Sequence, residues 1–142
     1  MRQTILLLLL QFNFLFLIAQ TERDLVEVPL NDYMVGTSYN YPEQIKKAFI
    51  EEAKLYLTRQ GESWIVTPSE YAALFERRTP GEFNGRTSKL RSIDIYQDVA
   101  YAEIDVIIPS IDAHFIDLIL LKKFGEEWKR RLFERFRNRS GH

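Results

Sequence analysis

The hydrophobic pattern is clearest between residues 89 and 123, where apolar and polar side chains alternate. Three segments there are rich in Ile, Val and Tyr, which is typical of β-strands: Lys89–Tyr96, Val99–Ile108 and His114–Lys123. Turn-forming residues separate the segments at Gln97-Asp98 and at Pro109-Ser110. The pattern therefore predicts an antiparallel meander of three long strands.

Helical periodicity precedes the meander. Apolar residues recur on one helical face between residues 25 and 38, at Val26, Leu30, Tyr33 and Met34. This spacing predicts a helix from about Val28 to Thr37, with Pro29 in the first turn, where its missing N–H is not needed. A second predicted helix begins at Pro42 and places three residues on its inner face: Ile45, Ala48 and Phe49.

A short hairpin and a third helix are predicted next. From Ala53 the period changes to two, with Leu55 and Leu57 on one side, and Trp64–Val66 forms a returning strand. The string Thr67-Pro68-Ser69-Glu70 matches a capping box with Pro at the first helical position. We expect this helix to continue to about Arg77 and to bury three residues: Tyr71, Leu74 and Phe75.

The order of these elements predicts an α+β domain with helices packed on one face of a sheet. Residues 79–88 are predicted to form a loop that leads into the meander. The last segment is ambiguous, because Trp128, Leu132, Phe133 and Phe136 fit a helix as well as a strand. Acidic residues interrupt the basic run from Lys129 to Arg139, which favours a solvated face over a membrane or nucleic-acid surface.

Residues 1–19 resemble a secretory signal peptide, with Arg2 before an apolar stretch. Gln11 and Asn13 interrupt this stretch, which is shorter than the roughly 20 residues of a membrane span. We expect cleavage after Ala19, one domain over residues 20–142, and export to the periplasm or the medium, with no stable membrane span after cleavage. A retained anchor is the alternative.

Composition excludes several classes of function. A net charge of −1 with a pI near 6.1 gives no electrostatic surface for nucleic acid. The chain has no Cys, which excludes disulfides, thiol catalysis and Cys-ligated metals, and its 2 His residues do not support a His-rich zinc site. Phosphate-binding glycine loops and hydrolase motifs are absent as well, so no metal or cofactor is expected.

Several local strings, in this order, carry a resemblance to a known family: Tyr33-Met34-Val35-Gly36; Ala48-Phe49 with Ala53; Ser92-Ile93-Asp94 with Val99-Ala100; and Phe115-Ile116-Asp117 with Leu121 and Trp128. Together they span residues 26–130 and resemble the nuclear transport factor 2-like superfamily, within it the branch labelled putative lumazine-binding. The chain is also similar to polyketide-cyclase and ketosteroid-isomerase-like domains of that superfamily.

The chain departs from the family pattern in three places. Similar members usually have a His where this chain has Ile50, and their Gly-x-Trp turn is one residue longer here, Gly125-Glu126-Glu127-Trp128. Their last strand is apolar beyond the Trp, whereas residues 129–136 here are largely charged. The missing His removes one titratable group from the expected site, which weakens the case for catalysis.

The resemblance implies a cone, in which a curved antiparallel sheet wraps around N-terminal helices and residues 129–137 form its last strand. A pocket would lie between the concave face and the first helix, where small ligands bind. We expect six residues to line it: Tyr33, Tyr101, Glu103, Phe115, Asp117 and Ile119. Asp117 is the candidate catalytic base, because it is an acid flanked by apolar residues; a hydrogen-bonded structural acid is the alternative.

Three functions remain open from the sequence. The first is an exported, non-catalytic domain that binds a small apolar or aromatic molecule. The second is an isomerase, dehydratase or cyclase that moves a proton through Asp117 while a Tyr stabilises the oxyanion. The third is a structural domain that forms a homodimer through the outer face of the sheet, and we expect a homodimer in any case.

Overall fold

The computed structural model describes residues 22–59 and 61–137. A first helix covers residues 22–38, and two short helices follow, α2 (Pro42–Lys47) and α3 (Pro68–Ala73). The predicted capping box is present, because the Thr67 side chain accepts from the Glu70 backbone N–H and the Glu70 side chain accepts from the Thr67 backbone N–H. It fixes the start of α3.

Six strands form one sheet: β1 (Phe49–Arg59), β2 (Glu62–Val66), β3 (Thr87–Tyr96), β4 (Val99–Ile108), β5 (Ala113–Phe124) and β6 (Glu127–Arg137). A short 3₁₀ helix, η1 (Pro109–Ile111), connects β4 to β5. The strand order is β2-β1-β6-β5-β4-β3, and the pairing of β1 with β6 is parallel while the others are antiparallel. The sheet is therefore mixed, not wholly antiparallel as expected.

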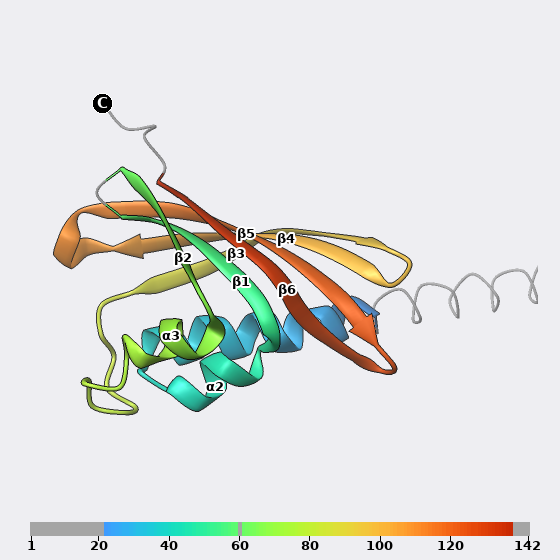
Figure 1. Cartoon of the computed structure of the whole chain (residues 1–142), viewed down its shortest axis with the longest axis horizontal. Coiled ribbons are helices and arrows are strands. Elements are labelled where there is room, and N and C mark those ends of the chain that lie inside the picture. The colour runs from blue at the N-terminus through green and yellow to red at the C-terminus, as the bar shows by residue number, and fades with distance from the viewer. Residues whose placement is uncertain (1–21, 60, 138–142) are drawn as a thin grey trace, which may run out of the picture.

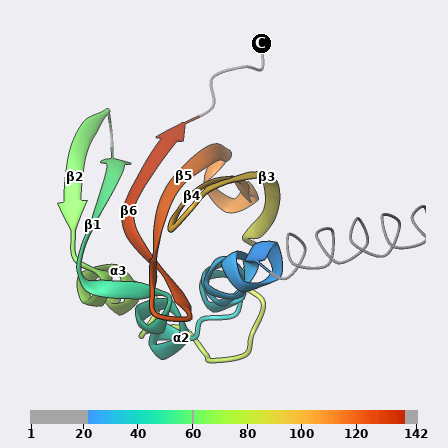
Figure 2. The same ribbon diagram turned by 90° about the vertical axis from the view of Figure 1, so that its right-hand side faces the viewer.

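The helices lie on one side of the sheet, which curves over them (Figures 1 and 2). Small and branched side chains from β4 face inward, namely Ala100, Ala102, Ile104 and Val106, and all are fully buried. The first helix packs against this face through Val26, Leu30 and Tyr33, which are also fully buried. The α+β cone is confirmed. None of the helices in the described part of the chain is long and apolar enough to cross a membrane.

Three predicted helix boundaries are wrong. The second helix ends at Lys47, so Phe49, which was expected on its inner face, begins β1 instead. The first helix is already formed at residue 22, so Pro29 lies inside it and is buried instead of occupying its first turn. Burial of the helical face that begins at Val26 offsets the hydrogen bond that Pro29 cannot make. The third helix ends at Ala73, four residues earlier than expected, and Leu74, which was expected to be buried, is 48% exposed.

The last strand contains a β-bulge that the sequence pattern does not reveal. The register of β5 with β6 shifts between Leu120, which pairs with Leu132, and Leu121, which pairs with Arg130. Because an extra residue reverses the alternation, Trp128 and Arg130 before the bulge face inward, and so do Phe133 and Arg135 after it. Residues 129–137 are thus a strand. The expectation of a solvated basic face is wrong for Arg130 and Arg135, which are buried.

Candidate functional site

A buried ion pair occupies the centre of the concave face. Asp117 on β5 is opposite Arg135 on β6 in the strand register, and neither side chain is more than 9% exposed. Arg135 Nε donates to Asp117 Oδ1 at 2.6 Å, and Arg135 Nη2 donates to Oδ2 at 2.8 Å. This bidentate pairing satisfies both carboxylate oxygens. Burial lowers the pKa of Arg135, but the adjacent Asp117 carboxylate, together with Tyr71 and Tyr33, outweighs burial and raises that pKa well above the usual range.

Tyr33 brings the first helix into the same network. Its hydroxyl donates to Asp117 Oδ2 at 2.7 Å and accepts from Arg135 Nη2 at 2.8 Å and from Arg86 Nη2 at 2.7 Å. Burial, together with the Asp117 carboxylate, raises the pKa of Tyr33 well above its ordinary value. Tyr33 is therefore a neutral hydroxyl that links a helix to two strands and a loop.

Arg86 reaches the network from the loop before β3. Its backbone N–H donates to Asn84 Oδ1 at 3.0 Å, which positions the loop, and its guanidinium is 3.5 Å from Asp117 Oδ2. The Nε of Arg86 is buried and has no hydrogen-bond partner among the described residues. Arg86 thus keeps a donor that no group of the described residues uses.

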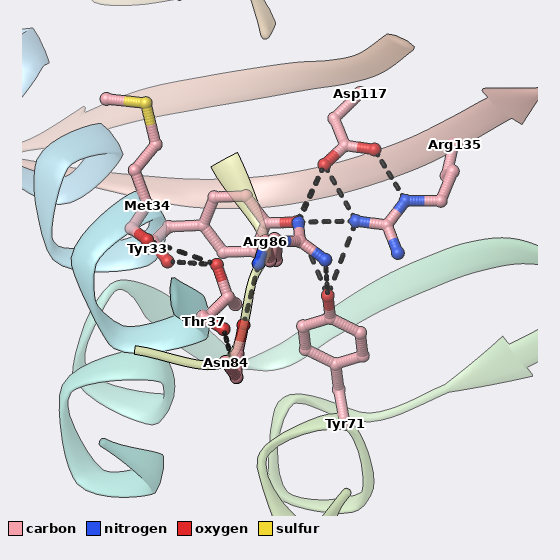
Figure 3. A network of polar contacts seen from close by, with 8 residues as sticks. All are labelled: Tyr33, Met34, Thr37, Tyr71, Asn84, Arg86, Asp117 and Arg135. Atoms are coloured by element: carbon pink, nitrogen blue, oxygen red, sulfur yellow. Dashed lines mark hydrogen bonds and ion pairs between the residues drawn. The ribbon is translucent and has the colours of Figure 1, made fainter. Parts of the chain in front are cut away.

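Tyr71 on α3 completes the group, and Figure 3 shows its hydroxyl directed at the two guanidinium groups. The distances are 3.4 Å to Arg135 Nη2, 3.5 Å to Arg86 Nη1 and 3.4 Å to the Tyr33 hydroxyl. Burial raises the pKa of Tyr71, but Arg135 and Arg86 together outweigh it, so the pKa is below the ordinary value. Of the two network tyrosines, Tyr71 is therefore the more weakly bonded and the easier to ionise.

A third arginine, Arg130 on β6, is fully buried beside the network. Its guanidinium carbon lies 3.9 Å from the centre of the Phe49 ring and 4.4 Å from that of Tyr33. Nε donates to the Ala48 carbonyl at 3.0 Å, whereas Nη1 and Nη2 have no partner within residues 22–59 and 61–137. Burial lowers the pKa of Arg130 to about 9, so the side chain is still a cation at neutral pH.

A cavity of about 190 Å³ adjoins one side of the network. Its polar lining consists of Tyr71, Arg78, Asn84, Arg86, Ser110 and Arg135, and its apolar lining consists of Leu74, Phe75 and Ile108. Asp117 is not part of the lining and has no exposed side-chain surface. A larger hollow of about 370 Å³ lies between the first helix and the β5–β6 turn, near Leu25 and Trp128, and touches none of the network residues.

Comparison with known proteins agrees with this architecture. The family model described as "Putative lumazine-binding" matches residues 21–130. The chain belongs to this family. No curated protein matches the sequence.

Solved structures similar to this member of the putative lumazine-binding family share its fold. A nuclear transport factor 2-like protein of unknown function from Silicibacter pomeroyi is 12% identical, with a TM-score of 0.74 over 84% of this chain and 98% of its own. A second, from Shewanella baltica, is 20% identical, with a TM-score of 0.71 over 86% and 97%. A protein from Kribbella flavida described as a putative ketosteroid isomerase is 8% identical, with a TM-score of 0.54 over 84% and 82%. The nuclear transport factor 2-like fold is thereby confirmed.

In this family member, four of the six expected pocket residues lie together on the inner side. Phe115, Asp117 and Ile119 alternate along β5 and are buried there, and Tyr33 contacts Asp117. Tyr101 and Glu103 lie on the opposite, outer face of the sheet, where the Tyr101 hydroxyl donates to Glu103 Oε1 at 3.1 Å. They do not face Asp117, because the antiparallel register places Ile104 opposite it and sends the odd-numbered residues of β4 outward.

Most of the network does not follow from the sequence pattern. Tyr71 was expected in the core without a polar role, and Arg86, Arg130 and Arg135 were not expected in the site. Arg86 lies in a loop without periodicity, and the bulge in β6 hides the inward arginines. The sign available in the sequence was the number of charged residues between 129 and 137, a segment that was expected to form a strand with one buried face.

No group of acidic or His side chains suited to bind a metal is found within the described part of the chain. The arrangement instead offers hydrogen-bond donors. Arg86, Arg135 and the Tyr71 hydroxyl all border the cavity, and each can donate to a bound molecule. Chemically, the site is suited to recognise acceptor atoms.

Proposed function

We propose that this protein is an exported domain that binds a small molecule in the cavity beside Tyr71 and does not convert it chemically. The supporting observation is the composition of the cavity wall: buried donors from Arg86 and Arg135 adjoin the apolar side chains of Phe75 and Ile108. Convergent polar groups in a partly apolar hollow are typical of ligand sites. Membership of the putative lumazine-binding family supports the same proposal.

The geometry disfavours catalysis by Asp117. Both of its oxygens already accept short hydrogen bonds, from Arg135 and from Tyr33. A general base must reach the proton that it removes, and Asp117 does not border the cavity. Its observed role is to hold Arg135, Tyr33 and Arg86 in place.

Native mass spectrometry of the protein purified from its own host tests the proposal. We expect a bound small molecule that leaves when the protein is denatured. Leu74→Trp should abolish its retention, because Leu74 lines the cavity and its exposed side chain can be enlarged without disturbing the core. Val28→Trp is the matched control, since Val28 is equally accessible but lines the larger hollow. If no small molecule binds, or if only Val28→Trp removes it, the proposed site is wrong.

A second candidate function is acid–base catalysis by Tyr71. The specific observation is its lowered pKa at the cavity wall, which favours proton exchange with a bound substrate. One structural neighbour is described as a putative ketosteroid isomerase, an activity that also requires proton transfer. Under this alternative, Tyr71→Phe keeps affinity and abolishes turnover of an enolisable ketone; under pure binding, wild type has no turnover to lose.

Homodimer formation and export complete the proposal. Leu120 on the outer face is 36% exposed, and its neighbours Ile116 and Leu118 on β5 alternate with the buried residues. An apolar outer face of this kind is suited to contact a second copy. Leu120→Lys should convert a dimer to a monomer in light scattering. A monomeric wild type would contradict the proposed dimer.

Export is tested separately. Sequencing of the secreted protein's N-terminus should show cleavage after Ala19, and protein retained in the cytoplasm would contradict export.

A further inference from the structure

The buried charges beside the cavity do not balance. Among the described residues, the buried ionisable side chains of the network are three arginines, Arg86, Arg130 and Arg135, against one carboxylate, Asp117. Guanidinium groups are cations in proteins, so three of them against one carboxylate give an excess of two positive charges. Burying an uncompensated ion costs several kcal/mol even after local relaxation. Asp117 is thus the one buried carboxylate among the described residues of the network, and the arginines outnumber it.

Two of the three buried arginines face the cavity. Arg86 and Arg135 border the cavity, whereas Asp117 lies behind them without exposed surface. The exposed Arg78 adds a third guanidinium to the lining, and the lining contains no Asp or Glu. The lowered pKa of Tyr71 agrees with this arrangement, since Arg135 and Arg86 favour its ionised form.

Donor capacity is also left unused at this wall. Arg86 is 4% exposed, and its Nε has no partner within the part of the chain that the structure describes. Its Nη1 makes only a 3.5 Å contact, with the Tyr71 hydroxyl. A buried guanidinium normally satisfies its donors, because an unpaired charged donor costs more than a neutral one.

We infer that the cavity binds a small organic anion, whose carboxylate or phosphate group lies between Arg86 and Arg78 and whose apolar part contacts Leu74, Phe75 and Ile108. Guanidinium groups match the planar, bidentate geometry of carboxylates and also bind phosphates. The inference rests on the proposed function, because it specifies the ligand class of the same site. It goes further in requiring a negative charge, which an apolar or aromatic ligand need not have.

Calorimetry with four probes tests the charge requirement: benzoate, phenyl phosphate, inorganic phosphate and the neutral benzamide. Benzoate or phenyl phosphate should bind at least about tenfold more tightly than benzamide, the ratio expected for one charge-assisted hydrogen-bonded group. Added salt should weaken the binding of the anions and leave benzamide unaffected. Inorganic phosphate should bind more weakly than phenyl phosphate, because it lacks the apolar part; equal binding would overturn the assignment of an organic anion.

Substitution of Ser110 gives a sharp pair of variants, since Ser110 is exposed on η1 and lines the cavity. Ser110→Asp places a carboxylate in the lining and should weaken benzoate binding at least about fivefold. Ser110→Asn introduces a side chain of the same shape as Asp but without the charge, and it should not weaken binding. Arg78→Gln should also weaken it, and Arg77→Gln is the matched control, because Arg77 is exposed but does not line this cavity. Ser110, Arg78 and Arg77 are all exposed, so a loss of folding does not confuse the result.

The outcomes separate the two proposals. If benzamide binds as tightly as benzoate and Ser110→Asp changes nothing, the anion inference is overturned while the binding function stands. If none of the probes binds and the protein purified from its host contains no small molecule, both are overturned.

Discussion

On the inner face of the sheet, Asp117 contacts Arg135 and lies beside Arg86, and on the outer face Asp105 contacts Arg91 and His114. The two acids are on neighbouring strands, and each is paired with nitrogen donors. The Asp117 side chain is fully buried, whereas the side chains of Asp105 and its two partners are 28–43% exposed. The same residue types therefore make a costly, rigid network on one face and a solvent-screened one on the other.

The largest effect is expected from Asp117→Asn. The change leaves Arg135 and Arg86 without their carboxylate in a buried site, so we expect a loss of about 3–5 kcal/mol in the free energy of unfolding. Urea denaturation measures it. A loss below about 1 kcal/mol would mean that the inner and outer acids are energetically alike, and the comparison would fail.

Removal of both partners of the inner ion pair should be better tolerated than removal of one. Asp117→Leu alone exposes the Arg135 charge to an apolar environment, whereas Asp117→Leu with Arg135→Met replaces the ion pair by apolar groups. We expect the double variant to be more stable than the single variant by at least about 1 kcal/mol in the same urea experiment. If the effects of the two substitutions on the free energy of unfolding simply add, the bidentate pairing of Asp117 with Arg135 contributes no interaction energy of its own.

Arg130 should give the inner face a distinctive alkaline response. Its pKa is about 9 in the folded chain, well below the ordinary value for arginine, so the unfolded chain binds more protons above pH 9 and the free energy of unfolding rises with pH. The rise is at most about 1.4 kcal/mol per pH unit. Above about pH 10 the raised pKa of Tyr33 acts in the opposite direction, because the folded chain then holds the extra proton.

The measurement is the difference in unfolding free energy between wild type and Arg130→Met, followed from about pH 8 to about pH 10. This difference should grow with pH in favour of wild type. A flat difference would show that Arg130 is not the buried cation with two unpaired Nη groups that the contacts of the described residues indicate.

The contrast between the faces also explains what the sequence could predict. Alternation in β4 and β5 identifies the strands and the inward position of Asp117, because residue types and burial both follow a period of two. The capping box predicts the start of α3 from local chemistry alone. These signals are local, so no knowledge of the partner strands is required.

The network itself depends on non-local facts. The inward position of Arg130 and Arg135 depends on the bulge in β6, which the register with β5 defines and the pattern of β6 conceals. Arg86 enters from a loop, where no periodicity gives a direction. Tyr101 and Glu103 were expected beside Asp117 because alternation puts both on one face of their strand, but which alternating set of β4 faces inward depends on the pairing with β5.

The smallest effect is expected from Asp105→Asn, the outer-face counterpart of Asp117→Asn. Arg91 Nε is 3.3 Å from Asp105 Oδ2 and His114 Nε2 is 2.9 Å from Oδ1, but all three side chains contact solvent. Water and salt screen such pairs, so the free energy of unfolding should fall by less than about 1 kcal/mol. The difference between the two Asp→Asn variants, measured in one urea series, then isolates the effect of burial on a similar set of contacts. A loss at Asp105 equal to that at Asp117 would show that the number of partners, and not their exclusion from water, determines the strength of these networks.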